Sequence, residues 1–415
     1  MSAPVPTSPS VPTSSGSAPP FHGGRIILTA LVAQGLGMGL FSLSAPLMTS
    51  LEAEFGASRA ALGGGMGIFI VVLTIASAIL GPILDRGPLR RIMLLGIAVT
   101  WVSILGMSRA TSLSQLALLM ALASTGIAMY GMIPATVLVV NWFVERRGVA
   151  MALAATGMSF AGFSFPPLCA YLIETVGWRD ALALIATGAA VLATAVIGAF
   201  AVKRPEDVGQ FPDGRADSVA PPVLARVPAT RFLGDRNFWL MGLGFGISLT
   251  AMGAVGTHLV AFGEDLGLSR QSAAWAPSVM STGALAGKLF AGWMVDRIDR
   301  RIVLFALLAA HATGWAILST EPGFGVMLAG CAVLGFGGGG MIPLPPVFQG
   351  ACFGRLVIGQ VGGLQALIAV PIGAPLPYLV GLSYDRTGSY VSAFLIIIAL
   401  IALALSLLLL LRLPE

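Results

Sequence analysis

The sequence predicts an all-α membrane protein in which twelve transmembrane helices form two parallel six-helix repeats. The composition, the recurrence of apolar runs and an internal repeat support this prediction. Of the 415 residues, 56% are hydrophobic and 10% are charged, and the mean hydropathy is +0.91, whereas about 25% of the residues in a soluble protein are charged. The apolar runs are roughly 20 residues long, the length of helix that crosses a hydrocarbon core.

The remaining composition excludes several classes of site. Glycine accounts for 53 residues, and small residues let membrane helices approach closely. The three cysteines, Cys169, Cys331 and Cys352, are scattered and fit no metal spacing, so we expect neither a metal site nor a disulfide framework. The net charge of +5 does not indicate a nucleic-acid partner, because an excess of Lys and Arg in a membrane protein mainly reflects topology.

The chain begins with a polar tail and then alternates spans and short loops. Residues 1–24 are rich in Ser, Pro and Thr and predict a disordered tail without the positive start of a signal peptide. A first bundle at 25–201 is expected to hold spans at 26–48, 60–83, 92–108, 113–142, 148–172 and 180–201. A cytoplasmic linker at 202–237 precedes a second bundle at 238–415, with spans at 239–261, 271–294, 302–319, 324–348, 356–380 and 390–411.

The distribution of Lys and Arg predicts the orientation. With a cytoplasmic N-terminus, 17 of the 23 basic residues lie on the cytoplasmic side and 5 on the other, with Lys288 inside a span. The linker holds 6 of the 17, so the short loops favour this orientation by 11 to 5. Because basic residues gather in cytoplasmic loops, we expect a multi-pass protein of the cell (inner) membrane with both termini in the cytoplasm.

The two halves of the chain are copies of one another. At an offset of 211 residues the aligned pairs include Gly56 and Gly267, Ser58 and Ser269, Arg59 and Arg270, Gly81 and Gly292, Asp85 and Asp296, Arg86 and Arg297, and Arg90 and Arg301. Each helix of the first half is separated by five helices from its equivalent in the second half, so the two equivalents cross the membrane in the same direction. The repeat is therefore parallel, related by an axis along the membrane normal.

The repeated loop resembles one found in the major facilitator superfamily. The segment Gly81-Pro82-Ile83-Leu84-Asp85-Arg86, followed by Arg90-Arg91, is similar to that family's loop between helices 2 and 3, and Gly292 to Arg301 is its echo between helices 8 and 9. One departure is Gly87-Pro88-Leu89, which occupies the turn where the family places a glycine directly after Asp-Arg. The resemblance covers about residues 26–411 and implies a monomeric carrier.

The resemblance also implies that these two loops latch the outward-facing state. The gating residues would be Gly81, Asp85, Arg86, Arg90, Gly292, Asp296, Arg297 and Arg301. An Asp at a helix end can face the positive N-terminus of another helix or pair with Arg in one conformer only. The alternative is a basic cytoplasmic turn with a capping Asp.

A narrower resemblance is to the monocarboxylate transporter and oxalate/formate antiporter branch. It is carried by Asn141-Trp142-Phe143-Val144-Glu145-Arg146-Arg147-Gly148-Val149-Ala150, by Phe353-Gly354 and by Tyr384-Asp385-Arg386-Thr387-Gly388-Ser389-Tyr390. The chain departs from the eukaryotic carriers at Gln34-Gly35, where they have an acidic residue before Gly.

Lys288 is the one charged side chain that the sequence places inside a span. It lies 8 residues before Asp296, about 12 Å inside the helix end, and no predicted span interior holds a carboxylate to pair with it. A buried ammonium usually faces a cavity or a partner, so we expect an anionic substrate to contact it. The resemblance implies the same, since this branch places a cationic residue there. Alternatively, Lys288 snorkels to the interface.

Four further residues are candidates for the substrate site. Gln34 and Gln365 reach similar depth and either donate to a carboxylate or hydrogen-bond to neighbouring helices. Tyr130 lies near mid-depth, where it caps the site or packs. His258 is expected near the outer end of its helix, to sense external pH, line the entry or pack. The oxalate carrier's second cation, in helix 11, is missing, which favours a monoanion.

The leading hypothesis is a secondary transporter for a small organic monoanion, working by alternating access as proton symport or anion exchange. An efflux carrier of the same fold for drugs is the alternative, although it would usually have an intramembrane acid. A sensor or membrane enzyme is a third reading. The sequence holds no catalytic constellation, metal spacing or Walker loop. We therefore expect no enzyme activity, no cofactor and no ATP-driven pump, and protons as candidate partners beside the anion and the bilayer.

Overall fold

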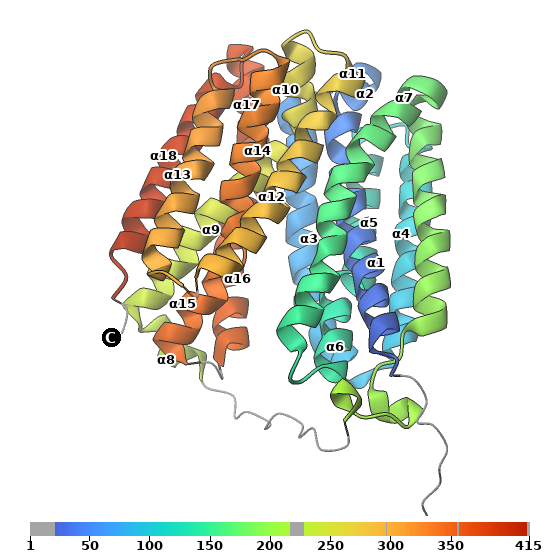
Figure 1. The fold of residues 1–415 in the computed structure, drawn as a ribbon. Helices are drawn as coiled ribbons and strands as arrows, with labels where there is room; N and C mark the ends of the chain where they lie inside the picture. The colour runs from blue at the N-terminus through green and yellow to red at the C-terminus, as the bar shows by residue number, and fades with distance from the viewer. Residues whose placement is uncertain (1–20, 216–227, 296, 355–356, 413–415) are drawn as a thin grey trace, which may run out of the picture.

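The computed structural model describes residues 21–215, 228–295, 297–354 and 357–412. These residues form α-helices and two short 3-10 helices, with no β-strand among them. Figure 1 shows two bundles of helices side by side, with residues 201–215 lying below the first bundle. Most of the predicted tail, residues 1–20, lies outside the described residues, whereas Gly23 and Gly24 already belong to the first helix.

The first half of the chain supplies six spans. Its helices are α1 (Gly23–Ser42), α2 (Ser44–Phe55), α3 (Arg59–Arg86), α4 (Leu89–Met107), α5 (Leu113–Tyr130), α6 (Met132–Trp142) and α7 (Arg147–Phe200). Helices α1 and α2 make one span, as do α5 and α6. Helix α7 makes two, because its backbone leaves the helical region at Gly177 (φ 81°, ψ 160°) and turns back on itself (Figure 1).

The second half follows the same plan after the linker helices η1 (Pro205–Val208), η2 (Pro212–Gly214) and α8 (Ala229–Leu233). Its helices are α9 (Arg236–Gly256), α10 (Leu259–Asp265), α11 (Arg270–Ala273), α12 (Trp275–Met294), α13 (Arg300–Leu318), α14 (Phe324–Gly340), α15 (Leu344–Phe353), α16 (Ile358–Gly373), α17 (Leu376–Thr387) and α18 (Val391–Leu409).

By length and composition, nine stretches of the described chain can cross a membrane, or ten if α9 and α10, bent by 50°, count as one span. The turn inside α7 adds one span, and α12, which is less apolar because it carries Lys288 and several hydroxyl side chains, completes the twelve. The predicted fold class is confirmed. The boundaries of the two domains and of the linker stay predictions.

The repeat in the sequence has a structural cause. Gly56 and Gly267 end a helix with positive φ angles of 58° and 82°, which glycine adopts without strain. Two residues later Ser58 and Ser269 accept a backbone N–H of the next helix, α3 or α11, in the way that N-cap residues do. The two-residue offset between Gly and Ser in both halves is therefore explained by the same helix-to-helix turn, which occurs once in each half.

The halves contact each other through α3 with α17 and α7 with α12. Glycine makes this approach close: a Cβ at Gly63 would collide with the carbonyl of Pro377, and one at Gly162 with Ser281. In Figure 1 the two bundles spread apart towards the end where residues 201–215, the start of α1 and the end of α18 lie, which we call the linker end. The opposite end, which holds α10, α11 and the end of α17, is called the latch end below.

The segment 201–215 is fastened to the first half at the linker end. Trp142 Nε1 donates to the carbonyl of Val202 at 2.8 Å, and Arg215 pairs with Glu145 at 2.8 Å. The carboxylate of Asp213 accepts the backbone N–H groups of Val144 and Glu145, at 2.9 and 2.8 Å, directly before α7 begins. Asp213 therefore holds in place, from the linker, the turn that leads into α7.

We expect Asp213→Asn to destabilise the protein at pH 7 by about 1 kcal/mol, because a neutral amide oxygen accepts weaker hydrogen bonds than a carboxylate does. Burial raises the pKa of Asp213, but the donors at Glu145, Val144 and Arg146 outweigh burial and hold the pKa below its ordinary value. A depressed pKa in the folded state contributes stability above the unfolded pKa of about 3.9 and loses it as the pH falls further.

Thermal unfolding in detergent at pH 7 and at about pH 3.5 tests this, because the difference between wild type and Asp213→Asn should shrink in acid. The control is Glu206→Gln, which removes an exposed charge from the same linker. If Asp213→Asn and Glu206→Gln have equal melting temperatures at pH 7, the charge of Asp213 does not stabilise this turn.

Candidate functional site

Lys288, on α12, lies where the two halves meet. Its Nζ donates to Ser159 Oγ at 3.3 Å, so a residue of α12 in the second half binds a residue of α7 in the first. The side chain is half-buried, and it belongs to none of the ion pairs found among the described residues. Gly283 and Gly287 pack the adjacent face of α12 against α14, which leaves Lys288 to face α7.

Gln34 lies on α1, which packs against α7, the helix that Lys288 contacts. The next residue, Gly35, packs against the carbonyl of Gly157, two residues before Ser159 on α7. Gln34 is 4% exposed, and its Nε2 has no hydrogen-bond partner in the described part of the chain. A buried donor without a partner costs about 1–3 kcal/mol. Among the described residues, Lys288 Nζ thus contacts a neutral hydroxyl, and Gln34 Nε2 contacts no acceptor.

The structure does not bring Gln365 and Tyr130 to Lys288. The amide of Gln365 donates to the carbonyl of Phe238 and accepts from Gln349, both at 2.8 Å, so it is engaged within the second half. Tyr130 is 2% exposed and faces the peripheral helices, beside a small void bounded by Ile97 and Ala190.

The predicted gating loops are described in part. Asp296 and the side chains of Asp85 and Arg86 lie outside the described residues. Arg297 donates to the carbonyl of Trp293 at 2.7 Å, and Arg301 donates to that of Leu411 at 3.2 Å. Gly81 ends the apolar part of α3, Arg90 opens α4, and Gly292 lies near the end of α12. The gating role of these loops stays a prediction.

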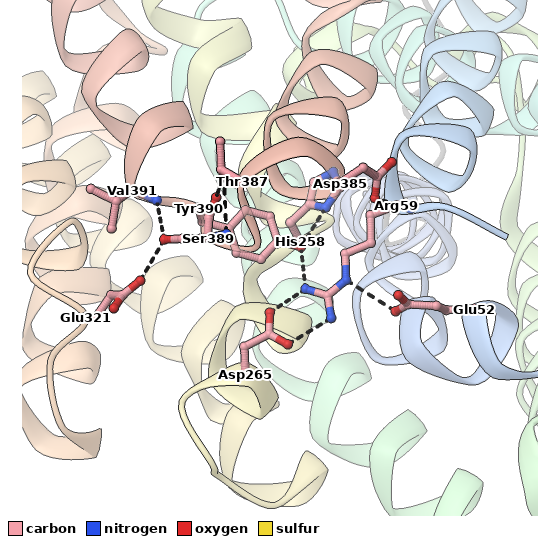
Figure 2. A network of polar contacts seen from close by, with 10 residues as sticks. All are labelled: Glu52, Arg59, His258, Asp265, Glu321, Asp385, Thr387, Ser389, Tyr390 and Val391. Atoms are coloured by element: carbon pink, nitrogen blue, oxygen red, sulfur yellow. Dashed lines mark hydrogen bonds and ion pairs between the residues drawn. The ribbon is translucent and has the colours of Figure 1, made fainter. Parts of the chain in front are cut away.

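A second polar network joins the halves at the latch end (Figure 2). Arg59, at the start of α3, is 5% exposed. Its guanidinium binds Asp265 with two nitrogens, the longer contact being 2.9 Å, and Glu52 at 3.2 Å. It also donates to Tyr390 Oη at 3.0 Å. Five donors in a planar fork suit arginine for such a cluster.

The same network caps α3 from the opposite half. Asp385, on α17, accepts the backbone N–H groups of Arg59 and Ala60 at 3.1 and 2.9 Å. The Arg59 guanidinium lies 3.8 Å from the ring centre of Tyr384, also on α17. We call Glu52, Arg59, Asp265, Asp385 and Tyr390 the latch.

His258 lies next to the latch, between the end of α9 and the start of α10. It is fully buried, with Nδ1 at 3.2 Å from Tyr390 Oη and Nε2 at 3.0 Å from the carbonyl of Pro377 (Figure 2). His258 therefore contacts residues of the second half at the latch end, whereas Lys288 contacts Ser159 of the first half.

Arg270, the repeat partner of Arg59, also reaches into the opposite half. It donates to Ser50 Oγ and Thr49 Oγ1, both at 2.9 Å, while its Nε pairs with Glu264. The sequence used Arg59 and Arg270 only as markers of the repeat. The signal that could have singled them out is that two arginines stand at equivalent helix starts, on the side of the membrane that the sequence predicts to hold few basic residues.

A large apolar cavity lies inside the first half. It has a volume of about 500 Å³, and its lining includes Leu47, Met66, Phe69 and Met120, with Tyr378 from the second half. Among the described residues, no charged side chain lines it. It therefore offers no cation to a carboxylate and is separate from Lys288.

Comparisons with known proteins agree with this architecture. Residues 27–269 and 241–415 match the family model described as Major Facilitator Superfamily. Monocarboxylate transporter 13 of Rattus norvegicus is 26% identical over 386 residues, covering 90% of this chain and 85% of that protein. Monocarboxylate transporter 11 of Mus musculus is 29% identical over 392 residues, covering 89% and 83%.

A solved structure shares the fold. It is an inward-facing, unoccupied bacterial homologue of the human lysosomal transporter Spinster, with a TM-score of 0.71 and 14% sequence identity. The match covers 94% of this chain and 97% of the other. At that identity the likeness supports the fold alone.

Proposed function

The chain belongs to the major facilitator superfamily and is related to the monocarboxylate transporters, and from this premise we propose that it carries a small organic monoanion across the membrane. The observation that carries this proposal is Lys288, a half-buried cation at the boundary between the halves with a neutral serine as its partner. An ammonium near the middle of a bilayer costs about 2.5–3.5 kcal/mol on insertion scales. A carboxylate bound to it would offset that cost.

The residues around Lys288 suit one carboxylate. Lys288 Nζ supplies the charge-assisted hydrogen bond, and the free amide of Gln34 supplies a second donor at similar depth. A single cation favours a monoanion over a dianion. Ser159 comes from the first half and Lys288 from the second, so an anion between them contacts both halves, as alternating access requires.

The latch and the gating loops would close opposite ends of the path. In the proposed orientation the linker end faces the cytoplasm, the latch end faces outside, and the present conformation is closed outside. The predicted loops at Asp85 and Asp296 would close the linker end when the latch opens. The coupling is proton symport or anion exchange, in the cell (inner) membrane, with a monomer as the working unit.

Efflux of apolar compounds is the second candidate. The cavity of about 500 Å³ favours it, because it falls in the range of about 300–1,000 Å³ typical of ligand pockets. Its apolar lining would suit a drug-like molecule better than a carboxylate.

Uptake of radiolabelled lactate, pyruvate, formate and oxalate into proteoliposomes tests the proposal. We expect at least one monocarboxylate to accumulate and oxalate to be the poorest substrate. A pH gradient that accelerates uptake would identify proton symport, and acceleration by anion preloaded inside would identify exchange. If every anion is ignored while an apolar dye is exported, the efflux hypothesis replaces the monoanion hypothesis.

A further inference from the structure

The contacts of His258 specify where its proton lies. A carbonyl oxygen only accepts, so the contact with Pro377 O at 3.0 Å requires a hydrogen on Nε2. In a neutral imidazole Nδ1 then carries no hydrogen and accepts from the hydroxyl of Tyr390, at 3.2 Å. That hydroxyl oxygen in turn accepts from Arg59. The latched state thus contains a directed chain of donors from Arg59 through Tyr390 and His258 to Pro377.

A protonated, charged imidazole at His258 does not fit this series of hydrogen bonds. A proton on Nδ1 would remove the acceptor that Tyr390 uses and would place a second cation close to Arg59. Both ring nitrogens contact neutral oxygens. The carboxylates nearby are engaged elsewhere: Asp265 and Glu52 bind Arg59, and Asp385 binds the backbone of α3. The ring is fully buried, and a buried charge without a contacting counter-ion is costly.

We propose that His258 is a proton-binding site that is available only when the latch is open, so that acid at the latch end holds that end open. A water-borne proton adds to Nδ1 to give imidazolium, and no other covalent bond changes. The site empties before the latch closes, so the proton returns to the side from which it came. His258 is therefore a regulatory proton site and not the carrier of a co-transported proton.

The sign and size of the effect follow from linkage. An imidazole in water has a pKa of about 6.5, and carboxylic acids titrate near about 4. Because only the open state binds the proton, the ratio of open to latched molecules rises as the pH falls through about 6.5. Between about pH 7.5 and 5.5 the ratio should rise about tenfold.

Ser278 provides the readout. It lies on α12 near the latch end, is fully buried, and donates to the carbonyl of Phe163 on α7 at 2.7 Å. We would place Ser278→Cys in a background lacking Cys169, Cys331 and Cys352 and measure its maleimide reaction rate in detergent, where both sides share one pH. Dividing by the rate at Thr320→Cys, an exposed loop position, cancels the titration of the thiol itself.

We expect the normalised rate to rise about tenfold from pH 7.5 to 5.5 in the otherwise native protein and to change less than about twofold in His258→Gln, which hydrogen-bonds but carries no charge. His258→Asn provides a second neutral variant if His258→Gln does not fold. Asp265→Asn should give a higher normalised rate than the native protein at both pH values. The rate should still increase from pH 7.5 to 5.5. A flat rate in the native protein, or a rise that persists in both neutral variants, would overturn the proposal.

The proposal depends on alternating access but not on the substrate, and the experiment uses no substrate. Failure to transport monocarboxylates would leave it intact. If Arg59→Ala exposes Ser278→Cys while pH does not, only the role of His258 fails. If neither exposes it, this end is no gate, and the alternating-access proposal fails as well.

Discussion

Replacing Lys288 by methionine should abolish transport without weakening the fold. Losing one partner of a buried charged pair costs about 2–5 kcal/mol, which corresponds to a fall in uptake of about 30-fold or more. Methionine has nearly the same length but needs no counter-charge. Because an ammonium near mid-bilayer is itself costly, we expect the melting temperature of Lys288→Met to equal or exceed that of wild type.

Initial rates of monocarboxylate uptake test the expected loss of transport, and thermal unfolding in detergent tests the expected stability. Lys288→Arg keeps the charge and should keep part of the uptake, while Leu289→Met changes the neighbouring, exposed residue and should keep it all. Normal uptake by Lys288→Met would remove the cation from the mechanism. Lost uptake together with a lower melting temperature would mean that Lys288 supports the fold through Ser159 instead.

The sequence could predict the fold because spans are local properties. The length of an apolar run shows directly whether it can cross the membrane, and the charged residues between runs indicate which side each turn lies on. The depth of Lys288 followed from counting along one helix. The turn of Gly56 and Ser58, repeated at Gly267 and Ser269, was visible as a constant offset.

The latch could not be predicted in the same way. Arg59 meets Asp265 and Tyr390 across separations of 206 and 331 residues, and no local pattern specifies such a pairing. Gln365 shows the same difficulty. Its depth suggested a substrate contact, but only the packing of α16 against α9 and α15 reveals that Phe238 and Gln349 already engage its amide.

Arg59→Ala should open the latch end. The change removes the pair with Asp265, the contact with Glu52 and the hydrogen bond to Tyr390. It also leaves Asp265 and Glu52 as partly buried carboxylates without their counter-ion. Breaking such a charged cluster by one partner costs about 2–5 kcal/mol, so the ratio of open to latched molecules should rise about 30-fold or more. The maleimide rate at Ser278→Cys measures this.

The repeat provides an internal comparison. Arg270 occupies the equivalent position, but its partners in the opposite half are the neutral hydroxyls of Thr49 and Ser50, and a hydrogen bond contributes about 0.5–1.5 kcal/mol, or up to about 3 when one partner is charged. Arg270→Ala should therefore expose Ser278→Cys less than Arg59→Ala does, and Arg109→Ala, an exposed arginine at the same end, should not expose it. Arg59→Lys should fall between, because lysine keeps the charge but loses the planar fork.

The variants can be ordered by how far they expose Ser278→Cys. If charge across the boundary holds the halves together, exposure of Ser278→Cys must follow the series Arg59→Ala, Arg270→Ala, Arg109→Ala. Equal exposure in Arg59→Ala and Arg109→Ala would mean that the glycine contacts of α3 and α17, at Gly63 and Gly381, hold this end closed without the latch. In that case the barrier to opening would lie in helix packing and not in the charges of the latch.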